Sequence, residues 1–202
     1  FLFNIYYMLN EKFTIAEEKE RIAFLQMKKQ LNLFNDCQIW LSPVGGGYVY
    51  DGSMIKMDDG SKVKSYLMEF KVRNFHLDME TEGFFLEVKK LDSLKKIQKK
   101  WKKELVEDYD ILYFNFTEHY SVCWNLSSLE KDGKLSKENR LMNKATMNST
   151  KDKIDKGVYL LKLEDGKKIP FKWDEIYYKQ YMSPPPVGLT IKEVVKAVGI
   201  PF

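Results

Sequence analysis

The chain has 202 residues, a net charge of +4, a hydrophobic fraction of 44% and an aromatic fraction of 14%. This length accommodates one domain with a sizeable core, and the aromatic content excludes a disordered chain. No segment approaches the roughly 20 consecutive apolar residues of a membrane-spanning helix. The composition therefore favours a single soluble domain.

The N-terminal segment and the cysteines point to a cytoplasmic protein. Residues 1–8 are apolar but lack the basic start and cleavage site of a signal peptide. The first residue is not Met, so the sequence begins inside a longer product or Met8 is the true start. Cys37 and Cys123 are too few for a disulfide framework or a zinc ribbon, and we expect two buried free thiols. With only two histidines, a bound metal would need oxygen ligands, which favours Mg²⁺ or Mn²⁺.

The predicted elements form a mixed α/β (α+β) domain with helices flanking a mixed sheet. In chain order we expect a helix at 14–32, strands at 37–41, 48–57 and 63–73, a helix at 84–106, strands at 110–116 and 120–126, a polar irregular segment at 130–156, and strands at 157–163 and 169–173. Thr14 is the expected N-cap of the first helix, and Asp59-Gly60 predicts a tight hairpin turn. The domain spans 10–175, and 176–202 forms a Pro-containing extension with a short helix.

One predicted hairpin carries acidic and basic side chains that could act together. Side chains alternate along a strand, so Glu69 and Lys71 share one face, while Tyr66, Met68, Phe70 and Val72 form an apolar stripe on the other. Asp51 on the preceding strand can be carried beside Glu69. Two carboxylates can hold Mg²⁺, and a lysine can stabilise the charge that develops on a phosphate.

Asp51 followed by Glu69-Phe70-Lys71 resembles the D…(D/E)-x-K signature of the PD-(D/E)XK nuclease superfamily, which includes restriction enzymes, Holliday-junction resolvases and many phage-encoded nucleases. The resemblance implies a restriction-endonuclease-like α-β-β-β-α-β core, which the predicted elements match over 14–116, and an Mg²⁺- or Mn²⁺-dependent DNA endonuclease. It implies the Phe70 backbone carbonyl as a further metal ligand. The proline that often precedes the acid is Tyr50 here. Many members cut as dimers, so the resemblance implies that this chain can form a homodimer.

The first helix carries a carboxylate on its apolar face. At 100° per residue, Glu20 falls in the middle of an arc made of Phe13, Ala16, Ala23, Phe24, Met27 and Leu31. A carboxylate there is costly unless it is paired or binds a cation. Many superfamily members place a metal-proximal Glu on this helix, so Glu20 is the expected auxiliary acid and metal ligand, with Glu17 and Glu18 as fallbacks. The alternative is that Glu20 reaches solvent at a loosely packed edge.

The long helix is rich in lysine. Its expected buried arc consists of Leu91, Leu94, Ile97, Trp101 and Leu105, with Lys90 and Gln98 inside it. Lys90 is expected to point towards the acidic cluster. The expected nucleic-acid-facing residues are Lys95, Lys96, Lys99 and Lys103, and a solvated helix face is the alternative. Arg73 shares the face of Lys71 and could contact a phosphate or form an ordinary salt bridge.

Two other functions stay open. The first is a catalytically inactive module that keeps the nuclease fold to bind nucleic acid or to serve as a phage virion-associated protein, with the basic segment 130–156 contributing. The second is a protein-interaction domain, which would require Glu69 and Lys71 to pair with each other on an exposed strand face. The aromatic residues from Tyr109 to Trp124 are expected to pack in the core rather than to stack on bases.

Overall fold

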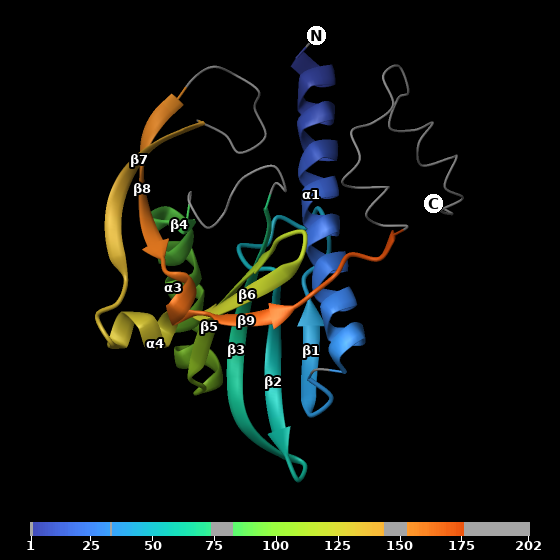
Figure 1. The fold of residues 1–202 in the computed structure, drawn as a ribbon, viewed down its shortest axis with the longest axis vertical. Coiled ribbons are helices and arrows are strands. Elements are labelled where there is room, and N and C mark those ends of the chain that lie inside the picture. The colour runs from blue at the N-terminus through green and yellow to red at the C-terminus, as the bar shows by residue number, and fades with distance from the viewer. Residues whose placement is uncertain (1, 33, 74–82, 144–152, 176–202) are drawn as a thin grey trace.

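A computed structural model describes residues 2–32, 34–73, 83–143 and 153–175. The elements are α1 (Leu2–Leu31), β1 (Cys37–Leu41), β2 (Gly52–Asp58), β3 (Ser61–Val72), β4 (Phe84–Glu87), α3 (Val88–Leu105), β5 (Tyr109–Phe116), β6 (Tyr120–Asn125), α4 (Leu126–Lys131), β7 (Ser136–Asn143), β8 (Lys153–Leu161), the short 3₁₀ helix η1 (Leu163–Asp165) and β9 (Lys167–Pro170). Figure 1 shows their arrangement. The chain is thus a mixed α/β protein, as the sequence predicts.

The central sheet has six strands in the order β1-β2-β3-β5-β6-β9. Strands β1, β2 and β3 form an antiparallel meander, and β3 runs parallel to β5. Asp59 and Gly60 both adopt positive φ at the β2–β3 turn (46° and 76°), which a tight hairpin requires. The parallel β3–β5 pair needs a crossover connection, and α3 lies on that connection.

Helices cover the two faces of β3 and bury different halves of its side chains. Phe24 and Met27 of α1 belong to one core cluster with Met68 and Phe70. Leu91 and Leu94 of α3 belong to another cluster with Leu67. Figure 1 places α1 on one side of the molecule, and α3 with the small β4-β8-β7 sheet on the other. Strand β3 is therefore central, and its part around Glu69 is buried on both faces.

The N-terminal helix and the start of the long helix differ from the prediction. Helix α1 runs through Thr14, so Thr14 is not its N-cap; one capping signal does not end a helix when no Gly or Pro interrupts the residues before it. Residues 84–87 form strand β4 rather than a helical turn, because they pair with β8. In the same helix Leu105 is 52% exposed, so it does not belong to the buried arc.

The segment predicted as irregular contains most of a second sheet. Much of 130–156 lies in β7 and the first half of β8, which pair with each other from Ser136 to Asn143. Polar residues on a half-exposed ladder give no hydrophobic alternation, so the sequence pattern missed them. Smaller shifts move the start of β2 to Gly52, the end of β6 to Asn125 and β9 to Lys167–Pro170.

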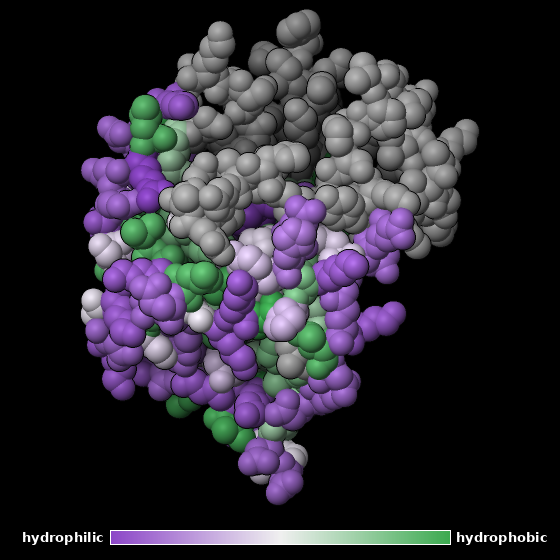
Figure 2. Space-filling model, viewed as in Figure 1, coloured by the Kyte–Doolittle hydropathy of each residue, from purple (hydrophilic) through white to green (hydrophobic). Residues whose placement is uncertain are grey.

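Other predictions concern the cysteines, the aromatics and the C-terminal extension. Both cysteines are free, and both are only partly buried. The aromatics of β5 and β6 pack in the core, with Tyr113, Phe114 and Trp124 all at most 3% exposed. The extension at 176–202 lies outside the described residues. Within the described part, no helix is long and apolar enough to cross a membrane, and hydrophilic side chains cover most of the described surface visible in Figure 2.

Candidate functional site

The candidate site lies where the pairing of β2 with β3 ends, at Gly52 and Met68. The backbone N–H of Asp51 donates to the carbonyl of Met68 (2.9 Å), and β2 begins at the next residue. At the next hydrogen-bonding position of β3, the Asp51 side chain replaces a backbone partner: its Oδ2 accepts the N–H of Phe70 at 2.6 Å. The N–H and C=O of one strand residue point to the same side, so the Phe70 carbonyl also points towards the Asp51 side of β3.

Arg21 of α1 holds the other oxygen of Asp51. Its guanidinium donates to Asp51 Oδ1 at 2.5 Å, and to the carbonyl and hydroxyl oxygens of Ser42 at 3.2 and 2.9 Å. The Ser42 hydroxyl donates in turn to the carbonyl of Tyr50 at 2.7 Å. Arg21, Ser42 and Asp51 are all buried. This network fixes the Asp51 carboxylate between α1 and β3.

Glu69 has one paired and one unpaired carboxylate oxygen. Lys90 of α3 lies 2.8 Å from its Oε1, as the helical arc of α3 predicts. The other oxygen, Oε2, is buried and has no hydrogen-bond partner among the described residues. Burial raises the pKa of Glu69 well above its ordinary value, and the charges of Asp51 and Glu20 add to this rise, against the opposing effect of Lys90. An orphaned carboxylate oxygen of this kind is a candidate cation ligand.

Glu20 and Lys71 form the second pair of the cluster. Glu20 is 8% exposed, and its Oε1 lies 3.4 Å from Lys71 Nζ. Burial raises the pKa of Glu20; Lys71 opposes the rise and Asp51 adds to it. Beside it, burial and the charge of Lys71 lower the pKa of Lys19 to about 8, against the opposing charge of Glu20. Glu20 is thus buried beside Lys71 and within the electrostatic reach of Asp51, and does not extend into solvent.

The two fallback acids of α1 lie elsewhere. Glu17 Oε2 accepts the backbone N–H of Gly45 at 2.7 Å, which ties α1 to the loop before Asp51. Glu18 is only partly buried. The run Gly45–Gly47 therefore serves as a strand connection held by α1.

Arg73 and the α3 lysines have other partners or face solvent. Arg73 donates to Asn115 Oδ1 (2.5 Å), the Phe85 carbonyl (2.7 Å) and the Tyr113 hydroxyl (3.0 Å), so it links β3, β4 and β5. Lys95 forms an ion pair with Glu130. The remaining predicted nucleic-acid lysines, Lys96, Lys99 and Lys103, are exposed.

Arg21 and Ser42 are the site residues that the sequence prediction missed. Arg21 follows Glu20 on the same helix, and a basic residue beside a buried acid could have suggested a pair across to Asp51. Ser42 carries no recognisable signal, because its role depends on the loop that returns the chain to Asp51.

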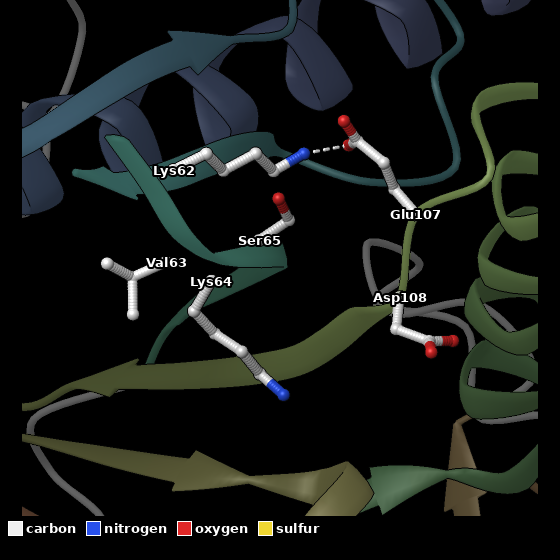
Figure 3. A pocket seen from close by; sticks show the side chains of 6 residues that line it. All are labelled: Lys62, Val63, Lys64, Ser65, Glu107 and Asp108. Carbon is white, nitrogen blue, oxygen red and sulfur yellow. Dashed lines mark ion pairs between the residues drawn. The ribbon is translucent and has the colours of Figure 1, made fainter. Parts of the chain in front are cut away.

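A surface pocket lies at the other end of β3. Its lining residues are Lys62, Val63, Lys64, Ser65, Glu107 and Asp108 (Figure 3). It contains the Lys62–Glu107 ion pair and none of the clustered acids. Ser65 and Glu69 are four residues apart, about 13 Å along a strand. The buried cluster is therefore the better candidate site, because it contains a buried carboxylate oxygen without a described partner.

Comparisons with known proteins identify no relative. No protein-family model, no curated protein and no solved structure matches the chain. Within the described ranges, no group of three or more His, Cys, Asp or Glu side chains is placed to hold a metal ion. The carboxylates of Asp51, Glu69 and Glu20 are instead each turned to a basic partner.

Proposed function

We propose that this chain is a metal-dependent phosphodiesterase, and more particularly an endonuclease that hydrolyses DNA. The observation that carries the proposal is Glu69 Oε2, a buried oxygen without a described partner, in a cluster with Asp51, Glu20, Lys90 and Lys71. A buried carboxylate oxygen with no partner is costly. A divalent cation would remove that cost, because oxygen is the ligand that Mg²⁺ and Mn²⁺ prefer.

The residues present fit such a cation in part. Glu69 Oε2 would hold it, together with Asp51 and the Phe70 carbonyl, which points to the same side of β3 as the Asp51 contact. Each carboxylate oxygen has two lone pairs, so Asp51 retains acceptor capacity beside Arg21. Glu20 would serve as an auxiliary ligand after releasing Lys71.

The other residues of the cluster would each have a separate role in the reaction. When bound, Mg²⁺ would polarise the phosphodiester and lower the pKa of a coordinated water. Lys71 would place its ammonium beside the phosphate and neutralise the charge that develops there. Arg21 and Ser42 would keep Asp51 in place, and Lys90 would limit the repulsion among the acids.

The topology supports the same proposal. A helix, an antiparallel three-stranded meander, a helix and a strand parallel to the third strand follow one another along the chain. Apart from the short β4, which lies between β3 and α3 and belongs to the second sheet, this order resembles the α-β-β-β-α-β core that the motif Asp51…Glu69-Phe70-Lys71 implies. We propose this restriction-endonuclease-like core on that combined basis.

One observation favours a second candidate function. Every acid of the cluster has a basic partner: Arg21 for Asp51, Lys90 for Glu69 and Lys71 for Glu20. A cluster neutralised in this way could persist without a metal, in a module that only binds nucleic acid. The protein-interaction alternative is weaker, because Glu69 is buried and pairs with Lys90 rather than with Lys71.

Cleavage and metal binding separate the two candidates. We expect the protein to cut plasmid or branched DNA with Mg²⁺ or Mn²⁺, and Glu69→Gln and Lys71→Met each to slow cutting by about 100-fold or more. The matched controls are Glu107→Gln and Lys62→Met, an ion pair outside the cluster that joins the start of β3 to the segment before β5, and these should cut within about two-fold of the unmodified protein. Calorimetric titration with Mn²⁺ gives an independent reading. DNA binding that survives without cutting or Mn²⁺ binding would establish the inactive module.

A further inference from the structure

Three aromatic side chains, one on β1 and two on the loop that leads into Asp51, form a partly exposed patch. We call Trp40, Tyr48 and Tyr50 the aromatic platform. Trp40 is 43% and Tyr48 is 49% exposed, and both are unusually large side chains to leave in solvent. Their ring centroids lie 5.7 Å apart, and each lies within 6.0 Å of the Tyr50 ring. Such contacts hold the rings in fixed orientations.

The platform lies on the same face of the sheet as Glu69. Side chains alternate along β1, and Ile39 and Leu41 pack into the core cluster of α1, so Trp40 points to the opposite face. Tyr50 packs on Trp101 of α3 with a centroid distance of 5.1 Å, which places it on the α3 face. Glu69, paired with Lys90 of α3, faces this side as well.

The loop that carries two of the three rings is held rigidly to the candidate site. Ser42 and Asp51 close its base through a backbone hydrogen bond of 2.9 Å, and Glu17 holds Gly45 at its tip. A Cβ on Gly46 would lie 2.7 Å from the Tyr48 ring, so glycine allows that ring to pack against the loop. The rings are therefore ordered before any ligand arrives, which lowers the entropic cost of binding.

We infer that the aromatic platform binds unpaired bases of a DNA strand whose phosphate backbone passes through the Asp51–Glu69 cluster. Exposed Trp and Tyr faces stack on any base, because every base has a π-face. The charge of α3 fits a nucleic acid: it carries eight lysines and two acidic residues, and Lys99, Lys100, Lys102 and Lys103 around Trp101 are exposed. This inference rests on the proposed nuclease function and assigns it a substrate with a single-stranded segment.

The test measures binding and cutting separately. Binding of a single-stranded oligo-dT of about 20 nucleotides is followed in EDTA, by anisotropy of the labelled DNA and by quenching of protein fluorescence. We expect Trp40→Ala and Tyr48→Ala each to weaken binding by about 10-fold, and Trp40→Phe to retain most of it. The matched control is Leu141→Ala, an exposed apolar side chain on β7, which should bind within about two-fold of the unmodified protein. Circular dichroism of each variant checks that it is folded.

Cutting of flapped and fully paired duplexes, with Mg²⁺, gives the second reading. We expect the flapped substrate to be preferred, and this preference to disappear in Tyr48→Ala. Unchanged oligo-dT binding in Trp40→Ala and Tyr48→Ala would overturn the inference even if the protein cuts DNA. Oligo-dT binding that depends on Trp40 and Tyr48, without any cutting, would support the aromatic platform as a base-binding surface and contradict the proposed nuclease function. Loss of self-association in these variants, with DNA binding intact, would also overturn it in favour of a protein interface.

Discussion

The two ends of β3 carry similar charged residues in opposite environments. At its start, Lys62 pairs with Glu107 and Lys64 with Asp110, and these side chains are 22–39% exposed. Near its end, Glu69 pairs with Lys90, and the Glu69 side chain is only 10% exposed.

The pKa directions at the two ends differ accordingly. Hydrogen bonds from Lys62 and then Tyr109 lower the pKa of Glu107. Burial raises the pKa of Glu69 despite its lysine. The comparison teaches that burial, rather than the presence of an ion-pair partner, decides which acid is stable as a carboxylate, and hence which acid could gain from a cation.

The largest difference between the two ends should appear when a basic partner is removed. Arg21→Met would leave the Asp51 carboxylate buried without its partner, and we expect a loss of about 3–5 kcal/mol in the free energy of unfolding. Urea denaturation checks this value. The double variant Arg21→Met/Asp51→Asn should recover part of the loss, because it removes the stranded charge. A loss below about 1 kcal/mol for Arg21→Met would show that water reaches Asp51 and that the cluster is not a buried site.

A divalent metal should raise the free energy of unfolding by binding at Glu69, at the buried end of β3, and not at the Lys62–Glu107 pair. If Mn²⁺ binds at Glu69, a concentration 100-fold above its Kd adds about 2.7 kcal/mol to the unfolding free energy, or about 5–10 °C in Tm for a chain of this size. Glu69→Gln should abolish the shift, and Glu107→Gln should keep it. An equal Mn²⁺ shift in both variants would place the cation outside the cluster.

The pH dependence of stability should change at the buried end in a defined direction. Because the pKa of Glu69 is raised on folding, the unfolded chain ionises first as pH rises above the ordinary value of the acid. Stability is then lost between that value and the folded-state pKa. Glu69→Gln cannot ionise, so it should gain stability relative to the unmodified protein as pH increases from 4 to 8. Thermal unfolding at several pH values measures this difference, and a difference that stays constant or falls with pH would contradict the prediction.

How much of the site the sequence could predict depends on whether the signal for a residue is local. Strand alternation placed Glu69 and Lys71 on one face, and helical periodicity found Glu20 and Lys90, because these signals are local. The Asp59-Gly60 turn brought Asp51 to β3. The partners of these residues were harder to predict: Lys71 pairs with Glu20 and Arg21 with Asp51 across elements, and such contacts depend on how α1 lies on the sheet.

Strand β4 and the β7–β8 ladder were not predictable from local pattern. Residues 84–87 continue into a helix and read as part of it, and only pairing with β8 makes them a strand. In β7 the partners are mostly polar, so neither face shows apolar alternation. In both cases the stabilising contacts come from residues more than 60 positions away or from a polar edge. Glu20, Glu69 and Lys90 escape this problem because each lies in an element with a periodic signal, and Asp51 escapes it because it directly precedes β2.

The smallest effects should come from the exposed end of β3. Lys62→Met should cost at most about 1 kcal/mol, because an exposed ion pair gains little over hydrated charges. The lowered pKa of Glu107 means that its contribution is present above the ordinary pKa of the acid and is lost as pH falls through the folded-state pKa. About 0.5 M salt should weaken this contribution by screening, while the cost of Arg21→Met should persist. Salt titration of urea midpoints measures both. Equal salt sensitivity at the two ends would mean that the acidic cluster is as hydrated as the surface pair, and the reason to expect a bound cation there would be gone.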